Sequence, residues 1–410
     1  MKKFYVLLLL SLMTVLTQAQ VVQQLPMLPK SEMGHAAEMV NPLSLNAKPW
    51  TRGELPTSIV DSRRASSRRS LSSVQELVGG YKTTQVTYDD EKDEDKESET
   101  VYTFVRKGDT ENEIVFTGLV WGYDVKATVD LETGEFEIPH QHVFDHSTYG
   151  SVSLTLFFYY EGDDEYEAGW YYSTNEGIPG MVGEDGSLLI GAYYCLTVDE
   201  YKSGKQTYNN APLSYLFKPG ILTPTNGAMV NMLPSESTDE NAEPEYQYVA
   251  VEIAESANTV SVTNFAGYGE TVQINLSDDN TLSIAKQLVY QGGTTYGNFN
   301  SYSYKETSGA TSYSQIISEN PIVGKYDADA LTWGPWIMYS KVNKKEYGIL
   351  YLGGIVLYTD GTKFPDPSAG ISNIKAEQSD APIYSIDGRR LEKVPAHGLY
   401  IQNGKKYIAK

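Results

Sequence analysis

Cysteine is almost absent from this chain of 410 residues, in which Cys195 is the only one. A single cysteine excludes an intramolecular disulfide and any Cys-X-X-Cys motif for redox chemistry or zinc. Cys195 lies in the apolar stretch LLIGAYYCLTV, and the only histidines in its half of the repeat described below are those of residues 140–146. We therefore expect a buried, unreactive thiol rather than a catalytic nucleophile.

Basic residues are also scarce. The chain has 32 Lys and Arg residues against 53 Asp and Glu residues, which gives a net charge of −21. Proteins that bind nucleic acid need a basic surface to offset phosphate charge, so we expect no nucleic-acid partner. Beyond the N-terminus, no window reaches the roughly 18 unbroken apolar residues of a membrane-spanning helix, so we also expect no transmembrane segment.

The usual sequence signatures of catalysis are missing as well. There is no G-x-S-x-G motif, no H-E-x-x-H motif and no glycine-rich phosphate loop. Carboxylates are plentiful, but a pair of catalytic carboxylates is defined by its separation in space, which a sequence does not show. We therefore predict a protein that is not an enzyme and needs no cofactor, and we keep a secreted hydrolase that uses carboxylates as an alternative.

The N-terminus has the layout of a secretory signal peptide. Lys2 and Lys3 precede an apolar run that extends from Phe4 to Leu16, and Thr17-Gln18-Ala19 follows with small residues where a signal peptidase cuts. We predict a signal peptide over residues 1–20 and an exported protein. Residues 21–74 are polar and end in the Ser/Arg-rich stretch SRRASSRRSLSS, so we predict a disordered spacer there.

Strand-forming and turn-forming residues are abundant in the rest of the chain, which contains 32 tyrosines, 35 glycines and 18 prolines. In VKATVDLETGEFEI (125–138), apolar residues alternate with polar ones on both sides of Glu-Thr-Gly, which predicts a hairpin with one apolar face. We find no convincing helical period after the signal. The sequence predicts an all-β protein.

The chain also repeats itself. Residues 112–150 align with residues 258–297, and the aligned pairs include Gln141 with Gln287 and Tyr149-Gly150 with Tyr296-Gly297. We predict two homologous antiparallel β-barrel or sandwich units. The predicted boundaries are 75–225 for the first unit, 226–244 for a linker, 245–362 for the second unit, 363–380 for a second linker and 381–410 for a C-terminal β module.

Three stretches of the first unit carry a resemblance to a known family: LVGGYKTTQVTY, NEIVFTGL and VKATVDLETGEFEIP. With the later Tyr-Gly strand, they resemble the calycin-like (lipocalin-like) β-barrel domains of secreted proteins from Bacteroides and Prevotella relatives. The resemblance extends to both units. It implies a β-barrel fold, and it implies no activity.

The last residues, APIYSIDGRRLEKVPAHGLYIQNGKKYIAK (381–410), carry a second resemblance. They are similar to a short form of the C-terminal sorting domain of the Bacteroidetes type IX secretion pathway. Ile383-Tyr384-Ser385-Ile386, Asp387-Gly388, Gly398-Leu399-Tyr400-Ile401 and the final Lys405-Lys406 carry the similarity. It implies an extracellular protein, or one attached to the outer-membrane surface through the secretion machinery.

Three of the five histidines gather in IPHQHVFDH (138–146). On a strand, His140 and His142 point to one face, close enough to share a metal ion, and His146 would supply a third ligand. The aligned positions of the second unit are Lys286, Leu288 and Gly293, so the fold itself does not need histidine there. The alternative is a strand whose histidines are satisfied by their neighbours.

Tryptophans and tyrosines suggest a binding surface. Trp333, Trp336 and Tyr339 in LTWGPWIMYSK would form a platform on which sugar rings stack, and Trp170 in AGWYYST would form another. The alternative places these large side chains in a barrel core.

Taken together, these patterns predict a non-catalytic exported or cell-surface binding or structural protein. The expected partner is a glycan or a small hydrophobic ligand. Two alternatives stay open. One is a secreted hydrolase that uses carboxylates or a metal at the histidines of residues 140–146, and the other is an adhesion or spacer scaffold for protein partners.

Overall fold

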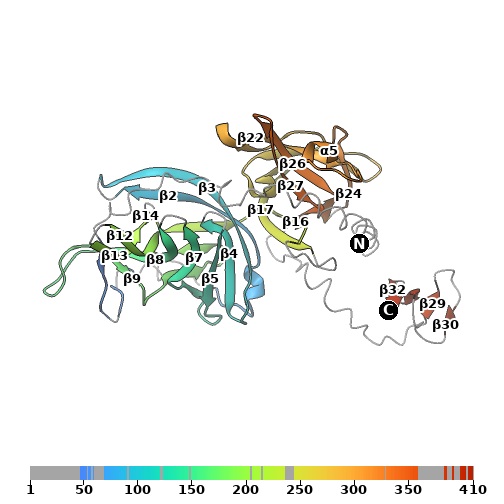
Figure 1. Ribbon diagram of the computed structural model, residues 1–410. Helices are drawn as coiled ribbons and strands as arrows, with labels where there is room; N and C mark the ends of the chain where they lie inside the picture. Colours follow the sequence, from blue (N-terminus) through green and yellow to red (C-terminus); the bar gives the residue numbers. More distant parts are fainter. Residues whose placement is uncertain are drawn as a thin grey trace. The chain divides into compact units, whose positions relative to one another are not determined.

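The computed structural model (Figure 1) shows an all-β chain, as the sequence predicts. It describes residues 47–52, 54–56, 59, 69–89, 92–120, 123–146, 149–203, 206–213, 216–235, 244–327 and 329–358. It also describes four short strands between residues 383 and 409. The predicted signal peptide and the predicted linker of residues 363–380 lie outside the described residues. Among the described residues, no helix has the length and apolar character needed to cross a membrane.

The first of two antiparallel barrels has eight strands. In chain order they are β2 (Gly79–Asp89), β3 (Glu94–Lys107), β4 (Glu113–Val120), β5 (Tyr123–Val129), β6 (Glu135–Ile138), β10 (Ile178–Val182), β11 (Leu188–Ile190) and β15 (Gly220–Pro224). The ring closes because β2 pairs with β15 on one side and with β3 on the other. The alternation predicted for β5 and β6 is present, since Val125, Ala127, Val129, Phe136 and Ile138 are all buried.

The second barrel also has eight strands and is closed. They are β16 (Gly227–Leu233), β17 (Glu245–Ser256), β18 (Thr259–Thr263), β19 (Thr271–Leu276), β20 (Thr281–Ile284), β24 (Ile322–Tyr326), β25 (Ala330–Trp333) and β28 (Gly353–Tyr358). The order around the ring matches that of the first barrel strand by strand.

Each barrel carries an accessory sheet, inserted after its fifth and its seventh strand. The first accessory sheet contains β7 (Gln141–His146), β8 (Gly150–Tyr160), β9 (Gly169–Ser173), β12 (Tyr193–Ser203) and β13 (Gln206–Pro212). The second contains β21 (Leu288–Gly292), β22 (Gly297–Tyr304), β23 (Ile317–Ser318), β26 (Trp336–Val342) and β27 (Lys345–Tyr351). In both, the inserted strands pair in the same order. The short β14 (Leu216–Phe217) joins β12 to β2.

The repeat seen in the sequence therefore has a structural counterpart, and one glutamine shows it in detail. The side chain of Gln141 accepts a hydrogen bond from the backbone N–H of Lys126 at 2.8 Å. It also donates one to the backbone carbonyl of Lys126 at 2.8 Å. Gln287 makes the equivalent pair of bonds with Gln273, at 2.8 and 2.9 Å. Each carboxamide thus takes the place of a backbone partner and ties the accessory sheet to a barrel strand.

Helical elements are few and short within the described residues. They include the 3-10 turns η1 (Val74–Leu77) and η2 (Phe265–Gly267) and the single-turn helices α4 (Gly293–Tyr296) and α5 (Tyr313–Ile316). The C-terminal residues form a separate antiparallel sheet of β29 (Ile383–Ser385), β30 (Arg390–Leu391), β31 (Gly398–Gln402) and β32 (Lys405–Ala409).

Two predicted boundaries differ from the structure. The predicted spacer of residues 21–74 includes β1 (Lys48–Pro49), which pairs in parallel with β9, and Trp50, which is only 5% exposed in the core of the first barrel domain. A two-residue strand has too little pattern to be seen in a sequence. The predicted linker of residues 226–244 includes β16, which pairs with β17 and β28. This strand is buried on both faces and so lacks the alternation that marks a half-exposed strand.

Candidate functional site

The candidate site of the first domain lies on the outer face of its accessory sheet, around Trp170. Successive side chains of β9 point to opposite faces, so Tyr171 and Ser173 enter the core while Trp170 and Tyr172 face outward. Trp170 lies directly opposite Tyr159 of β8 in the sheet. Trp170 is half-buried and Tyr159 is 46% exposed, so this pair presents aromatic surface to solvent.

Two further tyrosines complete an aromatic group, named here the Trp170 cluster: Tyr88, Tyr159, Trp170 and Tyr193. The Trp170 ring meets Tyr159 and Tyr193 edge to face, with centroids 5.7 and 5.2 Å apart and interplanar angles of 77° and 81°. The Tyr88 ring lies 6.0 Å from it, at 50°. These are favourable aromatic geometries, and they hold the indole in one orientation.

The base of the Trp170 cluster is apolar and fully packed. Phe157, Cys195 and Leu216 are at most 2% exposed and support the cluster from below. The Cys195 thiol has no exposed surface, which agrees with the expectation of a buried thiol. The half-exposed rings therefore pack on buried side chains that hold them in place.

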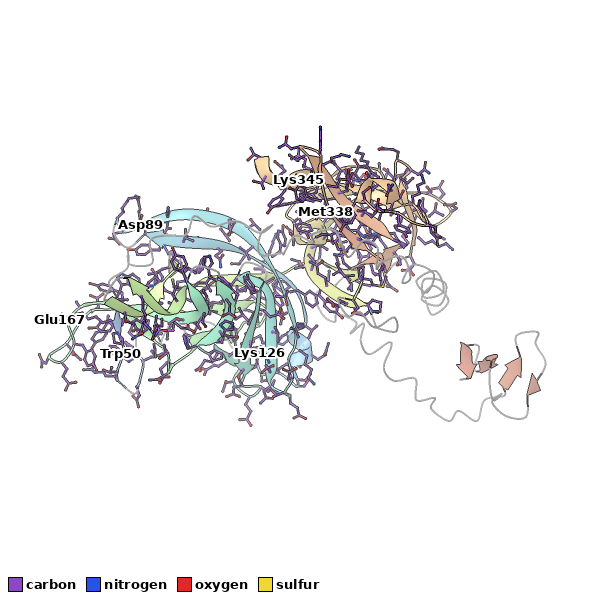
Figure 2. All side chains as sticks on the ribbon, viewed as in Figure 1. Trp50, Asp89, Lys126, Glu167, Met338 and Lys345 are labelled. Carbon is purple, nitrogen blue, oxygen red and sulfur yellow. The ribbon has the colours of Figure 1, made fainter. Side chains whose placement is uncertain are left out.

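Charged groups border the Trp170 cluster on the side of the β2–β3 hairpin. Lys218 forms an ion pair with Asp95 at 2.7 Å, and its ammonium lies 5.9 Å from the centre of the Tyr88 ring. The hydrogen bond to Asp95 raises the pKa of Lys218, so this ammonium stays charged. The Tyr88 hydroxyl donates to Asp93. Figure 2 labels Asp89, at the end of β2, on the same hairpin. An aromatic surface with a polar border results.

The other predicted aromatic residues lie elsewhere. Trp333 and Trp336 are 1% and 0% exposed, and both pack against Phe265 inside the second barrel domain, with ring centroids 5.7 and 5.4 Å from it. Trp336 also stacks on Tyr351 at 4.3 Å. Neither indole offers a face to a ligand, so the platform predicted for these two residues is not present. Tyr339 is 6% exposed and borders a surface hollow that is described below.

The three histidines of residues 138–146 have separate partners. His140 Nδ1 lies 3.1 Å from the hydroxyl of Thr155, and His142 Nδ1 lies 3.0 Å from that of Ser151. His146 Nδ1 accepts the backbone N–H of Tyr149 at 3.2 Å, and its ring stacks on the Tyr149 ring. In the part of the chain that the structure describes, no three His, Cys, Asp or Glu side chains are placed to hold one metal ion. The structure thus favours the alternative of satisfied strand histidines.

One of these histidines belongs to a Ser–His–Asp group, but its hydrogen bonds run in the wrong order for nucleophilic catalysis. The Ser151 hydroxyl donates its only proton to Asp199 Oδ2 at 2.5 Å. His142 Nδ1 must therefore donate to Ser151. In a catalytic triad the histidine lies in the middle and accepts the serine proton. This group is better suited to fixing strands β7, β8 and β12 than to acyl transfer.

Sequence reasoning found Trp170 but missed Tyr88, Tyr159 and Tyr193. The run FFYY at residues 157–160 hides the alternation of β8, because both of its faces are aromatic. The other two tyrosines come from strands far away in the chain. The sequence points to them only through its high tyrosine content, and that content does not indicate which of the 32 tyrosines contact one another.

The fold and the site together define a class: a tandem β-barrel protein with accessory sheets and a half-exposed aromatic cluster on one of them. Comparisons with protein families, curated proteins and solved structures found no significant match to this chain. Any statement about function therefore depends on the geometry of the site.

Proposed function

We propose that this protein is a non-catalytic glycan-binding protein, exported or held at the cell surface, and that the Trp170 cluster is its binding surface. The observation that carries the proposal is the half-exposed indole of Trp170, fixed edge to face between Tyr159 and Tyr193.

The chemistry of this surface suits a sugar ring. The apolar face of a pyranose packs on an exposed aromatic ring, and its hydroxyls need hydrogen-bond partners at the edge. The Trp170 cluster supplies both, since the tyrosine hydroxyls and the Lys218–Asp95 pair border the rings. Because packing already fixes the indole, little conformational entropy is lost on binding.

A glycan is favoured over a small hydrophobic ligand because of what fills the second barrel domain. An apolar ligand would need an interior cavity, as in barrels that enclose one small molecule. There the interior positions hold packed side chains, among them Phe265, Trp333 and Val356, all at most 1% exposed. Among the described residues, a group of several half-exposed aromatic rings lies on the outside of the first domain.

Export is supported by the two ends of the sequence. The first 20 residues have the layout of a signal peptide, and the C-terminal residues resemble a type IX sorting domain of the Bacteroidetes. The sequence stretches named above, such as LVGGYKTTQVTY, resemble those of calycin-like domains in secreted proteins from the same bacteria. On this basis we place the protein outside the cytoplasm, in the extracellular space or on the outer-membrane surface.

The test is a glycan-array screen of the mature chain, followed by calorimetric titration with the best-bound glycan. We expect Trp170→Ala to weaken binding at least tenfold, which corresponds to about 1.4 kcal/mol. The matched control is Tyr246→Ala, because Tyr246 is 38% exposed but lies on β17 of the second barrel. Trp170→Phe keeps most of the packing, so it separates lost binding from lost folding. Unchanged affinity in Trp170→Ala would refute the assignment, and a blank array would favour a scaffold for protein partners.

A further inference from the structure

Strands β22 and β26 run side by side in the second accessory sheet (Figure 1). The outer face of the sheet is hollowed at these two strands. The hollow has a volume of about 500 Å³. Its lining residues are Gly297, Asn298, Asn300, Tyr302, Tyr339, Ser340 and Lys341. We propose that this hollow is a second, independent binding site, and that it takes a short neutral saccharide. The proposal rests on the proposed function, since it assumes that glycans are the ligands of this protein.

The alternation of β22 creates the lining. Phe299 enters the core of the second domain, while Asn298, Asn300 and Tyr302 point to the opposite face. Asn300 lies directly opposite Tyr339 of β26. The two amides and the two tyrosines thus share one face of two neighbouring strands.

Gly297 shapes one end of the hollow. Its φ of +68° is a left-handed conformation that favours glycine. A Cβ atom at this position would lie 2.3 Å from Cγ2 of Val342 and 3.0 Å from the hydroxyl of Ser340. Only glycine therefore lets the start of β22 approach β26 this closely.

The lining favours hydrogen bonding over ring stacking. Tyr302 and Tyr339 are 8% and 6% exposed, and they meet edge to face at 5.7 Å, so a ligand reaches only their edges. Asn298 is exposed, and its carboxamide forms no hydrogen bond with the described residues. The Asn300 amide makes only a long bond of 3.4 Å, to the Asn298 carbonyl. Each carboxamide both donates and accepts, as sugar hydroxyls require.

The charge of the hollow favours a neutral ligand. Near the hollow, the Lys286 ammonium lies 4.6 Å from the centre of the Tyr302 ring and 4.0 Å from a carboxylate oxygen of Glu319. Among the lining residues themselves, Lys341 supplies the only cationic group, and its ammonium is bound to Glu346 at 3.0 Å. An anionic sugar would have to displace that carboxylate. It would also meet a chain with a net charge of −21.

The first domain shows that the fold does not need an amide at the position of Asn300. Gly150 and Gly297 both have positive φ and both begin the second strand of their accessory sheets. Counting from them, Asn300 and Tyr339 correspond to Ser153 and Thr197, which also face each other across two strands. Ser153 and Thr197 are 2% and 0% exposed, so the equivalent face of the first domain is closed there. Tyr302 and Tyr339 also pack in a buried cluster with Tyr313, Ile316 and Leu350, so their rings serve the fold. The exposed Asn298 and the neighbouring Asn300 have no such packing role, and they are the residues whose presence calls for a ligand.

The experiment is calorimetric titration of the mature full-length chain with xylohexaose, cellohexaose, mannohexaose and laminarihexaose. Trigalacturonic acid serves as the anionic probe. The hollow variant is the double substitution Asn298→Ala, Asn300→Ala, and Asn258→Ala on an exposed turn is the matched control. We expect two binding events for at least one neutral hexaose. The hollow variant should lose one of them, with at least a tenfold loss of affinity, and the control should keep both. Tyr339→Phe removes only a hydroxyl, so it tests the site without disturbing the packing.

The outcomes separate this inference from the proposed function. If the hollow variant keeps both binding events, the second site is refuted. If trigalacturonic acid binds the hollow more tightly than every neutral hexaose, the assignment of a neutral ligand is refuted. If Trp170→Ala alone abolishes all binding, the second site is also refuted while the proposed function stands. If Trp170→Ala changes nothing and the hollow variant abolishes binding, the hollow stands and the assignment to the Trp170 cluster fails.

Discussion

Replacing Trp50 by alanine should release the N-terminal strap, which consists of residues 47–52. Trp50 is 5% exposed, and its ring lies between 5.0 and 5.3 Å from the rings of Phe158, Tyr160, Tyr166 and Tyr171. Its backbone N–H donates to the carbonyl of Tyr172 at 2.8 Å, and its indole N–H donates to that of Glu54 at 3.1 Å. Figure 2 labels Trp50 within the first domain.

The size of the effect follows from what else holds the strap. Truncating a buried tryptophan to alanine costs about 3–5 kcal/mol. The remaining contacts include the two residue pairs of β1, a hydrogen bond of 2.6 Å between the hydroxyls of Thr51 and Tyr166, and exposed ion pairs such as Arg52 with Asp163, which solvent screens. Once the strap has detached, the free energy of unfolding cannot fall further, because all of the strap's contacts with the domain are already broken. We therefore expect a destabilisation of about 3 kcal/mol, near the lower end of that range, and a strap that exchanges freely while the barrel stays folded.

Urea unfolding followed by far-ultraviolet circular dichroism measures the loss, and hydrogen exchange over residues 47–52 and β9 locates it. Trp50→Phe retains an aromatic ring and should cost clearly less. Arg52→Ala should cost clearly less than Trp50→Ala, because it removes exposed ion pairs and a guanidinium 4.6 Å from the centre of the Tyr166 ring but leaves the buried indole in place. A Trp50→Ala protein within about 0.5 kcal/mol of the wild type, with the strap still protected, would show that the strap does not stabilise the domain.

Three further predictions concern stability. Trp333→Phe should cost less than about 1.5 kcal/mol in urea unfolding, because the buried indole N–H has no partner among the described residues and its removal offsets part of the lost packing. Gly354→Ala should cost about 1–3 kcal/mol in the same assay, since its Cβ would lie 2.5 Å from Cζ2 of Trp333; a neutral effect would show that the indole can shift. The hydroxyl of Tyr160, two backbone N–H groups and the Arg52 guanidinium of the strap hold the pKa of Asp163 below its usual value of 3.8. The strap should therefore be fully held above about pH 4 and loosen as the pH falls below it, which tryptophan fluorescence would follow, and Asp163→Asn should abolish this pH dependence.

The sequence by itself was sufficient for the class of fold and for the repeat. Strand alternation is a local pattern, so the hairpin of β5 and β6 could be read from residues 125–138 alone. The repeat could be read because both copies keep the same landmarks, such as Gln141 and Gln287, whose identical hydrogen bonds explain why the alignment falls where it does.

The tertiary structure decided which aromatic residues are accessible. Trp170 and Trp333 both lie on strands rich in aromatic residues, and nothing local distinguishes them. Trp333 is covered because Gly354, on a neighbouring strand, leaves room for its indole inside the barrel. Trp170 stays half-exposed because its face of the accessory sheet turns away from the core. Burial depends on which distant segments cover a face, and that information is spread along the whole chain.

The same reason explains the histidines, the strap and the hollow. Whether His140, His142 and His146 meet at one point depends on their neighbours on β8 and on the turn that follows β7. The strap is held on the domain because Trp50 packs among aromatic rings that lie more than 100 residues away in the chain. The hollow exists because Asn300 and Tyr339, 39 positions apart, become direct neighbours across two strands. Local patterns determined the strands of this protein, and contacts between distant strands determined its surfaces.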